Sequence, residues 1–267
     1  MNFSHLYSSA LTAELGTPDS TILFTDARRK VAINQAQLQW CDLTECAIRQ
    51  STVTCSNGIS EYNLLSTVNV PGQDFLRLAG QQPEYQLISS GSSASTQFVA
   101  GDDFPRREIN WLNQNEPGWR GSTGATPQGW YERMDGGRRF FGLVPPPRIG
   151  SSEVGKVLLP YVAKPSSMTS DTDVPFTFGS TVREDLEPYH QGLVHYAASE
   201  LEKLRLNAEG SQAQLQLFNG YLARFFRSRD HKGPKTIRTA RNYFQEVKSR
   251  RGFGRDDRTP LGKSNWS

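Results

Sequence analysis

The chain has 267 residues, of which 36% are apolar, and its formal net charge is +3. This length allows one large domain or two small ones, and the modest apolar share predicts many loops and contact surfaces. No stretch approaches the roughly 18 apolar residues of a membrane helix, and residues 1–16 lack the basic start and apolar core of a secretory signal. We therefore expect neither a membrane span nor a membrane partner.

The charge is distributed unevenly along the chain. Residues 224–263 hold 13 Lys and Arg against 4 Asp and Glu, whereas the remainder holds 17 basic and 23 acidic residues. A basic C-terminal arm on a mildly acidic body predicts a polyanionic partner, either a nucleic acid or an acidic protein surface. The alternative is that these cations form the solvated face of an amphipathic helix.

The first 45 residues predict two helices. Residues 5–15 form a short helix that ends at Gly16, and Thr25-Asp26 forms the N-cap of a second helix that reaches about residue 45. Trp40 is the large anchor of the second helix. Its packing face is predicted from residues that recur at steps of three and four, which are Ala27, Val31, Asn34, Leu38 and Cys41.

A β-type pattern begins at about residue 50. Residues 52–64 alternate around Asn57-Gly58, which is a strong signal for a hairpin. Residues 66–71 predict the end of a further strand at Pro71, and residues 85–100 predict two strands separated by a Gly- and Ser-rich linker. Residues 102–113 predict a short helix with Asp102 or Asp103 as its cap.

A second hairpin is predicted from residues 128 to 143. Its turn is Asp135-Gly136-Gly137, and the strand that follows must stop before Pro145–Pro147, because proline cannot donate hydrogen bonds to a neighbouring strand. Trp130 and Tyr131 lie on opposite faces of the first strand. We expect one of them to fill the core and the other to meet a neighbouring subunit. Another strand is predicted over residues 157–163.

Helical periodicity returns at about residue 181 and continues to about residue 250, with breaks at 207–210 and 231–234. The third of these helices carries Phe244 on its apolar face. The fold class is therefore predicted as α+β, in which N- and C-terminal helices form a bundle with an inserted β-rich module. The predicted segments are 1–49 (N-terminal helices), 50–177 (β-rich module), 178–250 (C-terminal helices) and 251–267 (extended arm).

The sequence contains no strong catalytic or metal-binding pattern. The spacing of Cys41, Cys46 and Cys55 matches neither a zinc site nor a disulfide framework, so we expect buried thiols in a reducing compartment, and no cofactor or metal. His190 and His195 are five residues apart, and His190 is expected in a core or interface. An enzyme that uses its carboxylates is a rival interpretation, and its candidates are Asp102, Asp103, Asp171 and Asp173.

Five segments in order along the chain carry a resemblance to a known family. They are "TDARRKVAINQAQLQWCDLTE" (25–45), "VPGQDFLRL" (70–78), "GATPQGWYERMDGGRRFFGLVPPPR" (124–148), "VLLPYVAKPSSMTSDTDVPF" (157–176) and "LVHYAASELEKL" (193–204). Together the chain resembles the head-to-tail adaptor (connector) proteins of tailed bacteriophages. The Ser/Gly run at 89–95 is softer than that family leads one to expect, and the terminal tail matches none of its motifs.

The resemblance implies a non-enzymatic structural protein of the virion, made in the host cytoplasm. It implies a homo-oligomeric ring of twelve copies that docks on the portal protein, joins a tail or nozzle protein and surrounds double-stranded DNA without reading its sequence. The arm is then expected to bind the portal, and packing within the module or between subunits is expected at Trp40, Trp130, Tyr131 and Phe244. The expected portal-binding residues are Arg250, Arg251, Phe253, Arg255, Leu261 and Trp266.

Two alternatives to this function stay open. The first is a DNA-binding protein that contacts phosphates through its basic C-terminal arm, which predicts steeply salt-dependent binding to duplex DNA. The second is another virion connector, such as a stopper or a tail-completion protein.

Overall fold

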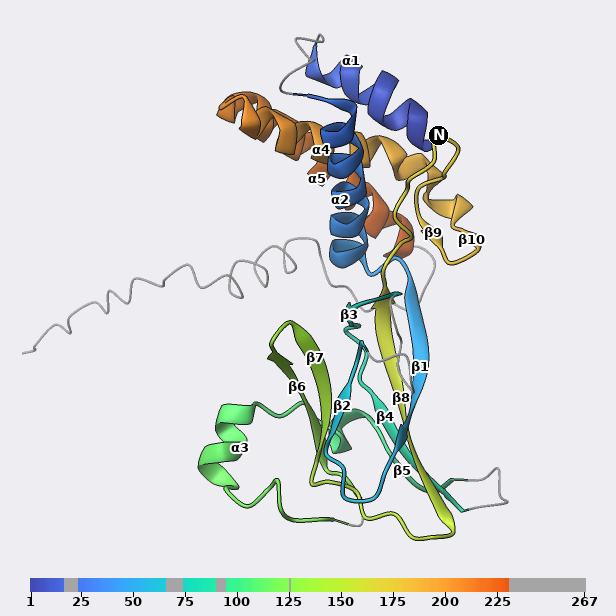
Figure 1. Cartoon of the computed structure of the whole chain (residues 1–267), viewed down its shortest axis with the longest axis vertical. Helices are drawn as coiled ribbons and strands as arrows, with labels where there is room; N and C mark the ends of the chain where they lie inside the picture. Colours follow the sequence, from blue (N-terminus) through green and yellow to red (C-terminus); the bar gives the residue numbers. More distant parts are fainter. Residues whose placement is uncertain (17–23, 66–73, 90–94, 125, 231–267) are drawn as a thin grey trace, which may run out of the picture. The chain divides into compact units, whose positions relative to one another are not determined.

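The computed structural model describes residues 1–16, 24–65, 74–89, 95–124 and 126–230 (Figure 1). Residues Met1–Phe218 form one compact unit, and a second unit begins at Asn219 within the last described helix. Helices and antiparallel sheets are both present, which confirms the α+β class. The predicted segment boundaries after residues 49, 177 and 250 stay predictions.

Helices occupy both ends of the described chain. A π-helical segment, η1 (His5–Ala10), continues directly into α1, and short 3₁₀ segments precede α3 and α4. The α-helices are α1 (Leu11–Leu15), α2 (Asp26–Thr44), α3 (Ile109–Asn115), α4 (His190–Leu204) and α5 (Ala208–Asp230). Helix α4 packs against η1, α1 and α2, so helices from the N-terminal and C-terminal parts of the described chain share one core.

The ends of α1 and α2 follow the predicted signals. Gly16 adopts a left-handed conformation (φ 70°) after α1, where a residue without Cβ is favoured. The Thr25 side chain accepts a hydrogen bond from the Arg28 N–H at the start of α2. Both boundaries are therefore confirmed.

The predicted packing face of α2 is mostly wrong, although Cys41 is buried as predicted. Ala27 and Val31 are exposed and Leu38 is only half-buried. The buried side lies about 150° further around the helix, given 3.6 residues per turn. This side is selected by its partners in α4, α5 and the 166–177 segment, and it consists of Arg29, Ala32, Ile33, Ala36, Gln37, Trp40, Cys41 and Thr44.

A five-stranded antiparallel sheet is organised around one long strand, β8 (Glu153–Ala163). Along one edge, β8 pairs with the whole of β1 (Ile48–Cys55). Along the other edge it pairs with β4 (Glu84–Ser89) and β3 (Phe75–Leu78), and β4 also pairs with β5 (Ser95–Val99). The predicted strands at 85–100 and 157–163 are confirmed, and β8 begins four residues earlier than expected.

A smaller sheet contains the second predicted hairpin. Strand β6 (Gly129–Asp135) pairs with β7 (Arg138–Val144), which also pairs with β2 (Glu61–Asn63). Gly136 and Gly137 have φ values of 54° and 78°, as a two-residue turn of type I′ requires. This hairpin and the end of its second strand before Pro145 are confirmed. A two-stranded pair, β9 (Thr177–Phe178) and β10 (Thr181–Val182), precedes the C-terminal helices.

The hairpin predicted at Asn57-Gly58 is wrong. A turn is present, but the strands on its two sides pair in different sheets, β1 with β8 and β2 with β7. The Gly58 N–H bonds to the Pro147 carbonyl, and the Ile149 N–H bonds to the Asn57 side chain. The turn is therefore a corner between two sheets. Strand β1 forms eight residue pairs with β8, whereas β2 has only three residues with which to pair.

Four further expectations concern the elements and their boundaries. Asp102 and Asp103 lie in a separate 3₁₀ turn, and α3 begins at Ile109 without a side-chain cap, so the predicted cap is wrong. A break follows the first C-terminal helix, but it covers residues 205–207 rather than the predicted 207–210, since α5 already begins at Ala208. The strand end at 66–71 and the helix with Phe244 lie outside the described residues.

The passage from α2 to the large sheet is held by arginine side chains. Arg77 of β3 bonds to the carboxylates of Asp42 and Glu45 at the end of α2. Arg183 donates to the Cys46 carbonyl (2.8 Å), and its guanidinium also pairs with Asp185. Hydrogen bonds from charged donors are stronger than those between neutral groups. Arg77 and Arg183 therefore hold the end of α2 and the residues after it from two different segments.

Candidate interaction surfaces

The predicted portal-binding residues cannot be placed. Arg250, Arg251, Phe253, Arg255, Leu261 and Trp266 all lie outside the described residues, as does Phe244. Their roles stay predictions. The predicted packing residues Trp40, Trp130 and Tyr131 are described, and all three are buried.

Trp40 lies at the centre of an aromatic cluster. Its ring centroid is 5.4 Å from that of Tyr189, 5.8 Å from Phe218 and 6.2 Å from Phe176. The cluster joins α2 to three other parts of the chain. These are the 166–177 segment, helix α5 and the 3₁₀ segment that precedes α4. Within this chain Trp40 is therefore a core residue, and contact with another subunit stays a prediction.

Trp130 and Tyr131 point to opposite faces of β6. The Trp130 ring stacks on Phe141 at 5.7 Å, and the Tyr131 ring meets Trp119 edge-on at 5.0 Å. The Tyr131 hydroxyl donates to Glu61 (2.8 Å), and burial raises the pKa of this tyrosine. Because both rings are buried in the chain, little of either is offered to a neighbour. The expected subunit contact stays a prediction.

Two amide side chains of α2, the half-buried Asn34 and the buried Gln37, hold the acidic link at 166–177. The Asn34 amide bonds to the backbone of Met168 in both directions, at 3.0 and 2.8 Å. Gln37 donates to the Ser166 carbonyl (2.9 Å) and accepts from the Phe176 N–H (3.1 Å). Sequence reasoning missed this role. The two amides lie three residues apart on α2, but the segment that they hold is 129 to 134 residues away, so the helix pattern contained no signal for this contact.

The candidate catalytic carboxylates do not converge. Asp171 accepts from Tyr7 (2.8 Å) and Lys30 (3.2 Å), and these two hydrogen bonds lower its pKa. Asp173 accepts from the backbone N–H groups of Thr169 and Ser170, as expected for a turn. Asp102 and Asp103 are exposed on a different part of the chain. Among the described residues, no cluster of three potential metal ligands is found.

His190 is a buried side chain, as expected. Burial lowers its pKa from 6.5 to about 4, helped by the nearby N-terminal amino group, and Glu187 opposes this change. The amino group of Met1 lies 3.3 Å from Nδ1. The three cysteines are also buried as free thiols, with 3.5 Å between the Sγ atoms of Cys41 and Cys46. The reducing compartment stays a prediction.

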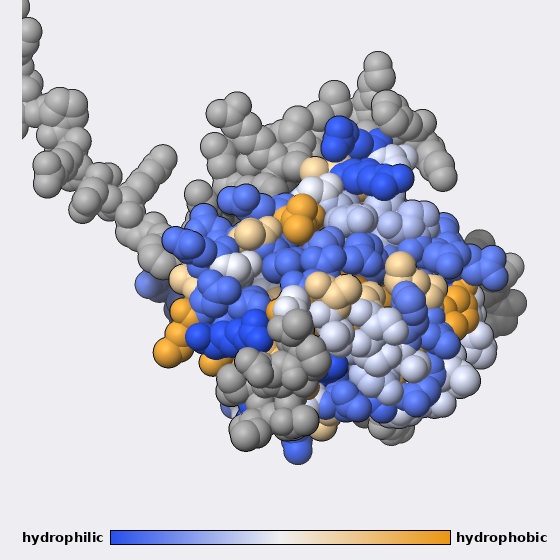
Figure 2. Space-filling model, turned by 90° about the horizontal axis from the view of Figure 1, so that it is seen from above, coloured by the Kyte–Doolittle hydropathy of each residue, from blue (hydrophilic) through white to orange (hydrophobic). Residues whose placement is uncertain are grey.

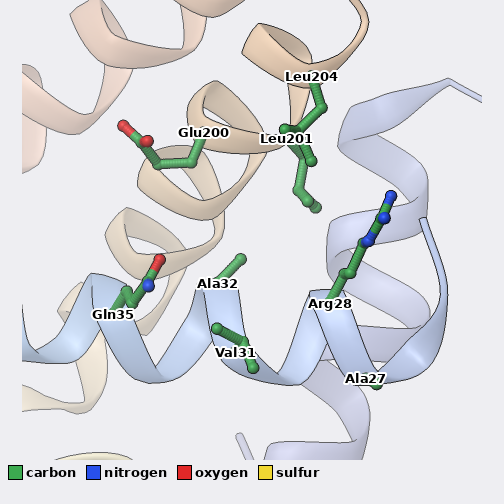
Figure 3. Close-up of a pocket in the computed structure, with 8 residues that line it drawn as sticks. All are labelled: Ala27, Arg28, Val31, Ala32, Gln35, Glu200, Leu201 and Leu204. Carbon is green, nitrogen blue, oxygen red and sulfur yellow. The ribbon is translucent and has the colours of Figure 1, made fainter. Parts of the chain in front are cut away.

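An open groove runs between α2 and α4 (Figure 3). Its volume is about 470 Å³. Ala32 and Leu201 face each other across it, with Arg28 near one end and Glu200 near the other. Its lining is mostly apolar and consists of Ala27, Arg28, Val31, Ala32, Gln35, Glu200, Leu201 and Leu204. On the face of the molecule in Figure 2, apolar side chains form small patches among polar ones.

The comparisons with known proteins complete this picture. No helix in the described ranges has both the length and the apolar character needed to cross a bilayer. No curated protein matches the chain. A family model described as SU10 adaptor protein matches residues 1–241 and so includes every described element. The chain therefore belongs to the SU10 adaptor protein family, a family of phage head–tail adaptors.

Proposed function

We propose that this phage structural adaptor forms a ring that docks on the portal and joins the DNA-filled head to the tail. The observation that carries the proposal is the family match over residues 1–241. The ring would contain twelve copies and contact a tail or nozzle protein on its other side. Double-stranded DNA would pass through its channel without sequence recognition.

The contacts in the body support a rigid building part. Trp40 and the amides of Asn34 and Gln37 connect α2 to segments far along the chain, so the helices and the acidic link form one packed core. We propose that this core is a helical bundle into which the β-rich module is inserted. The carboxylates that an enzyme would need lie apart and serve as turn and hydrogen-bond residues.

The charge distribution supports the proposed division of labour. A mildly acidic body would repel the phosphates of DNA and let the duplex slide through a channel. The basic arm would instead pair with portal carboxylates through Arg250, Arg251 and Arg255, since arginine binds carboxylates in a two-pronged manner. Phe253, Leu261 and Trp266 would supply the apolar anchors of that interface.

Deletion of residues 252–267 tests this proposal. We expect the shortened chain to keep its thermal unfolding midpoint and to lose co-sedimentation with purified portal rings. Charge reversal of Arg250, Arg251 and Arg255 to Glu should weaken portal binding at least tenfold. The matched control is Arg138→Glu, an exposed arginine of β7 outside the arm, which should bind like the wild type. Unchanged portal binding after the deletion would contradict the proposal.

A DNA-binding function is the second candidate, and the excess of cations over residues 224–263 favours it. It predicts that the full-length chain binds duplex DNA with an affinity that falls steeply with salt, and that deletion of 252–267 reduces the salt dependence. An adaptor arm should show little duplex binding at physiological salt. Fluorescence anisotropy at several salt concentrations distinguishes the two functions.

A further inference from the structure

Helix α2 carries exposed apolar residues on the side opposite its buried one. The buried side contains Trp40 and Ile33. The other side contains Ala27 and Val31, which are exposed, and the half-buried Leu38. Exposed apolar side chains that gather on one side of a helix mark a candidate contact surface. The pattern that mispredicts the core of the monomer therefore indicates a second contact surface.

This second side of α2 forms one wall of the groove with α4. Val31 is 54% exposed and Leu204, on the opposite wall, is 52% exposed. Leu206 follows two residues later, is 92% exposed and adopts a left-handed conformation with φ 59°. Leucine is strongly disfavoured there, since its Cβ crowds the following carbonyl, and its side chain gains no burial in return. Exposed apolar side chains therefore occur in the groove and again just after α4 ends.

A complementary ridge lies on the opposite side of α2. Phe218 of α5 packs on Trp40, so this part of α5 covers the buried side of the helix. Leu217, the neighbour of Phe218, points elsewhere and is 49% exposed, and Ala213 lies exposed one turn earlier. The body thus presents an apolar groove on one side of α2 and an apolar ridge of α5 on the other.

We propose that the α2–α4 groove receives the Ala213–Leu217 ridge of a neighbouring copy of this chain. A closed ring requires head-to-tail contacts, in which each copy uses two different, complementary patches. Each chain has both the groove and the ridge, and they lie on opposite sides of α2. A second copy would use both patches, one on each of its neighbours, whereas a different partner protein would use only one. The inference rests on the proposed ring and names its subunit contact.

Glutamate substitutions of exposed residues test the contact without disturbing the core. Val31→Glu and Leu217→Glu should each weaken self-association of the full-length chain at least tenfold, because each places a charge in a desolvated interface. The matched control is Met134→Glu on β6, which is 65% exposed and should associate like the wild type. Native mass spectrometry over a wide concentration range, with and without portal rings, gives the measurement. Unchanged thermal unfolding confirms that the variants fold.

Crosslinking tests the pairing of the two patches. Val31→Cys and Leu217→Cys are prepared in separate full-length chains and mixed with a short bismaleimide, and the native thiols are buried. We expect crosslinked dimers in the mixture and few in either variant alone. Efficient Val31–Val31 crosslinks, wild-type association of both Glu variants, or a wild-type chain that stays monomeric even with portal rings would each overturn the proposal.

The outcomes also separate this inference from the adaptor function. If the Glu variants assemble normally but no longer bind the portal, then the groove holds the portal, and the subunit contact is wrong while the adaptor function stands. If deletion of residues 252–267 leaves portal binding unchanged while the Glu variants still block self-association, then the arm's role fails and the subunit contact stands.

Discussion

Helix α2 and the β6–β7 hairpin bury their aromatic residues by different means. Trp40 of α2 is surrounded by rings from Phe176, Tyr189 and Phe218, all far along the chain. In the hairpin, the Trp130 ring stacks on Phe141 of the adjacent strand, across a two-residue turn. The hairpin is thus specified by neighbours in the sequence, whereas the side of α2 that is buried depends on segments that must first be brought together.

The largest expected effect is the loss of the distant cluster. Trp40→Ala should lower the free energy of unfolding by about 3–5 kcal/mol, because it removes the ring on which three segments converge. Val31→Ala on the same helix is the control, and it should change the unfolding free energy little, since Val31 is exposed. Urea unfolding followed by circular dichroism provides the measurement. A small effect of Trp40→Ala would show that the burial of α2 does not depend on these distant aromatic partners.

An intermediate effect is expected in the hairpin. A Cβ atom at Gly142 would lie 2.0 Å from the Tyr131 ring, so Gly142→Ala must displace that ring. The cost should be about 1–3 kcal/mol of unfolding free energy, as for other overpacked cores. Gly118→Ala introduces the same methyl group into open space and serves as the control. Near-UV circular dichroism should change for Gly142→Ala alone, and equal spectra for the two variants would contradict the prediction.

The smallest effect at neutral pH concerns His190, which packs near Phe176 beside the distant cluster. Its pKa is about 4 in the folded chain and near 6.5 when exposed, so the unfolded state binds the extra proton first. The protonation of His190 should therefore not affect the unfolding free energy above about pH 6.5. The unfolding free energy should fall as the pH decreases from 6.5 towards 4, and His190 should cause no further decrease below pH 4. His190→Leu should flatten that part of the curve. Thermal unfolding at several pH values, compared between the two chains, gives the test.

The same contrast explains what the sequence could predict. Turn chemistry is local, so Gly136-Gly137 and the prolines after Val144 were sufficient to place the β6–β7 hairpin and its end. The turn at Asn57-Gly58 has equally good chemistry, yet the strands beside it pair elsewhere because β8 competes for β1. Pairing between strands is decided by all available partners, and a local pattern contains no information about them.

The candidate surfaces were only partly predictable for a related reason. The family resemblance is confirmed by the match over residues 1–241. It could be recognised from the sequence because it depends on the order of several segments and not on which side of a helix is buried. The spacing of Ala27, Val31, Asn34, Leu38 and Cys41 predicts a packing face, but the buried side of α2 is decided by partners far along the chain, about which the spacing contains no information. The roles of Asn34 and Gln37 depend on the path of the 166–177 segment, which periodicity does not describe.

The long strand β8 also has a mechanical consequence. Its eight pairs with β1 run antiparallel, and its end at Ala163 leads directly into the segment that α2 holds through Ser166 and Met168. Interstrand hydrogen bonds lie perpendicular to the strands, so a pull along β8 would load them together in shear rather than one after another. The connection between the large sheet and α2 should therefore resist stretching along the strand far better than peeling from its edge.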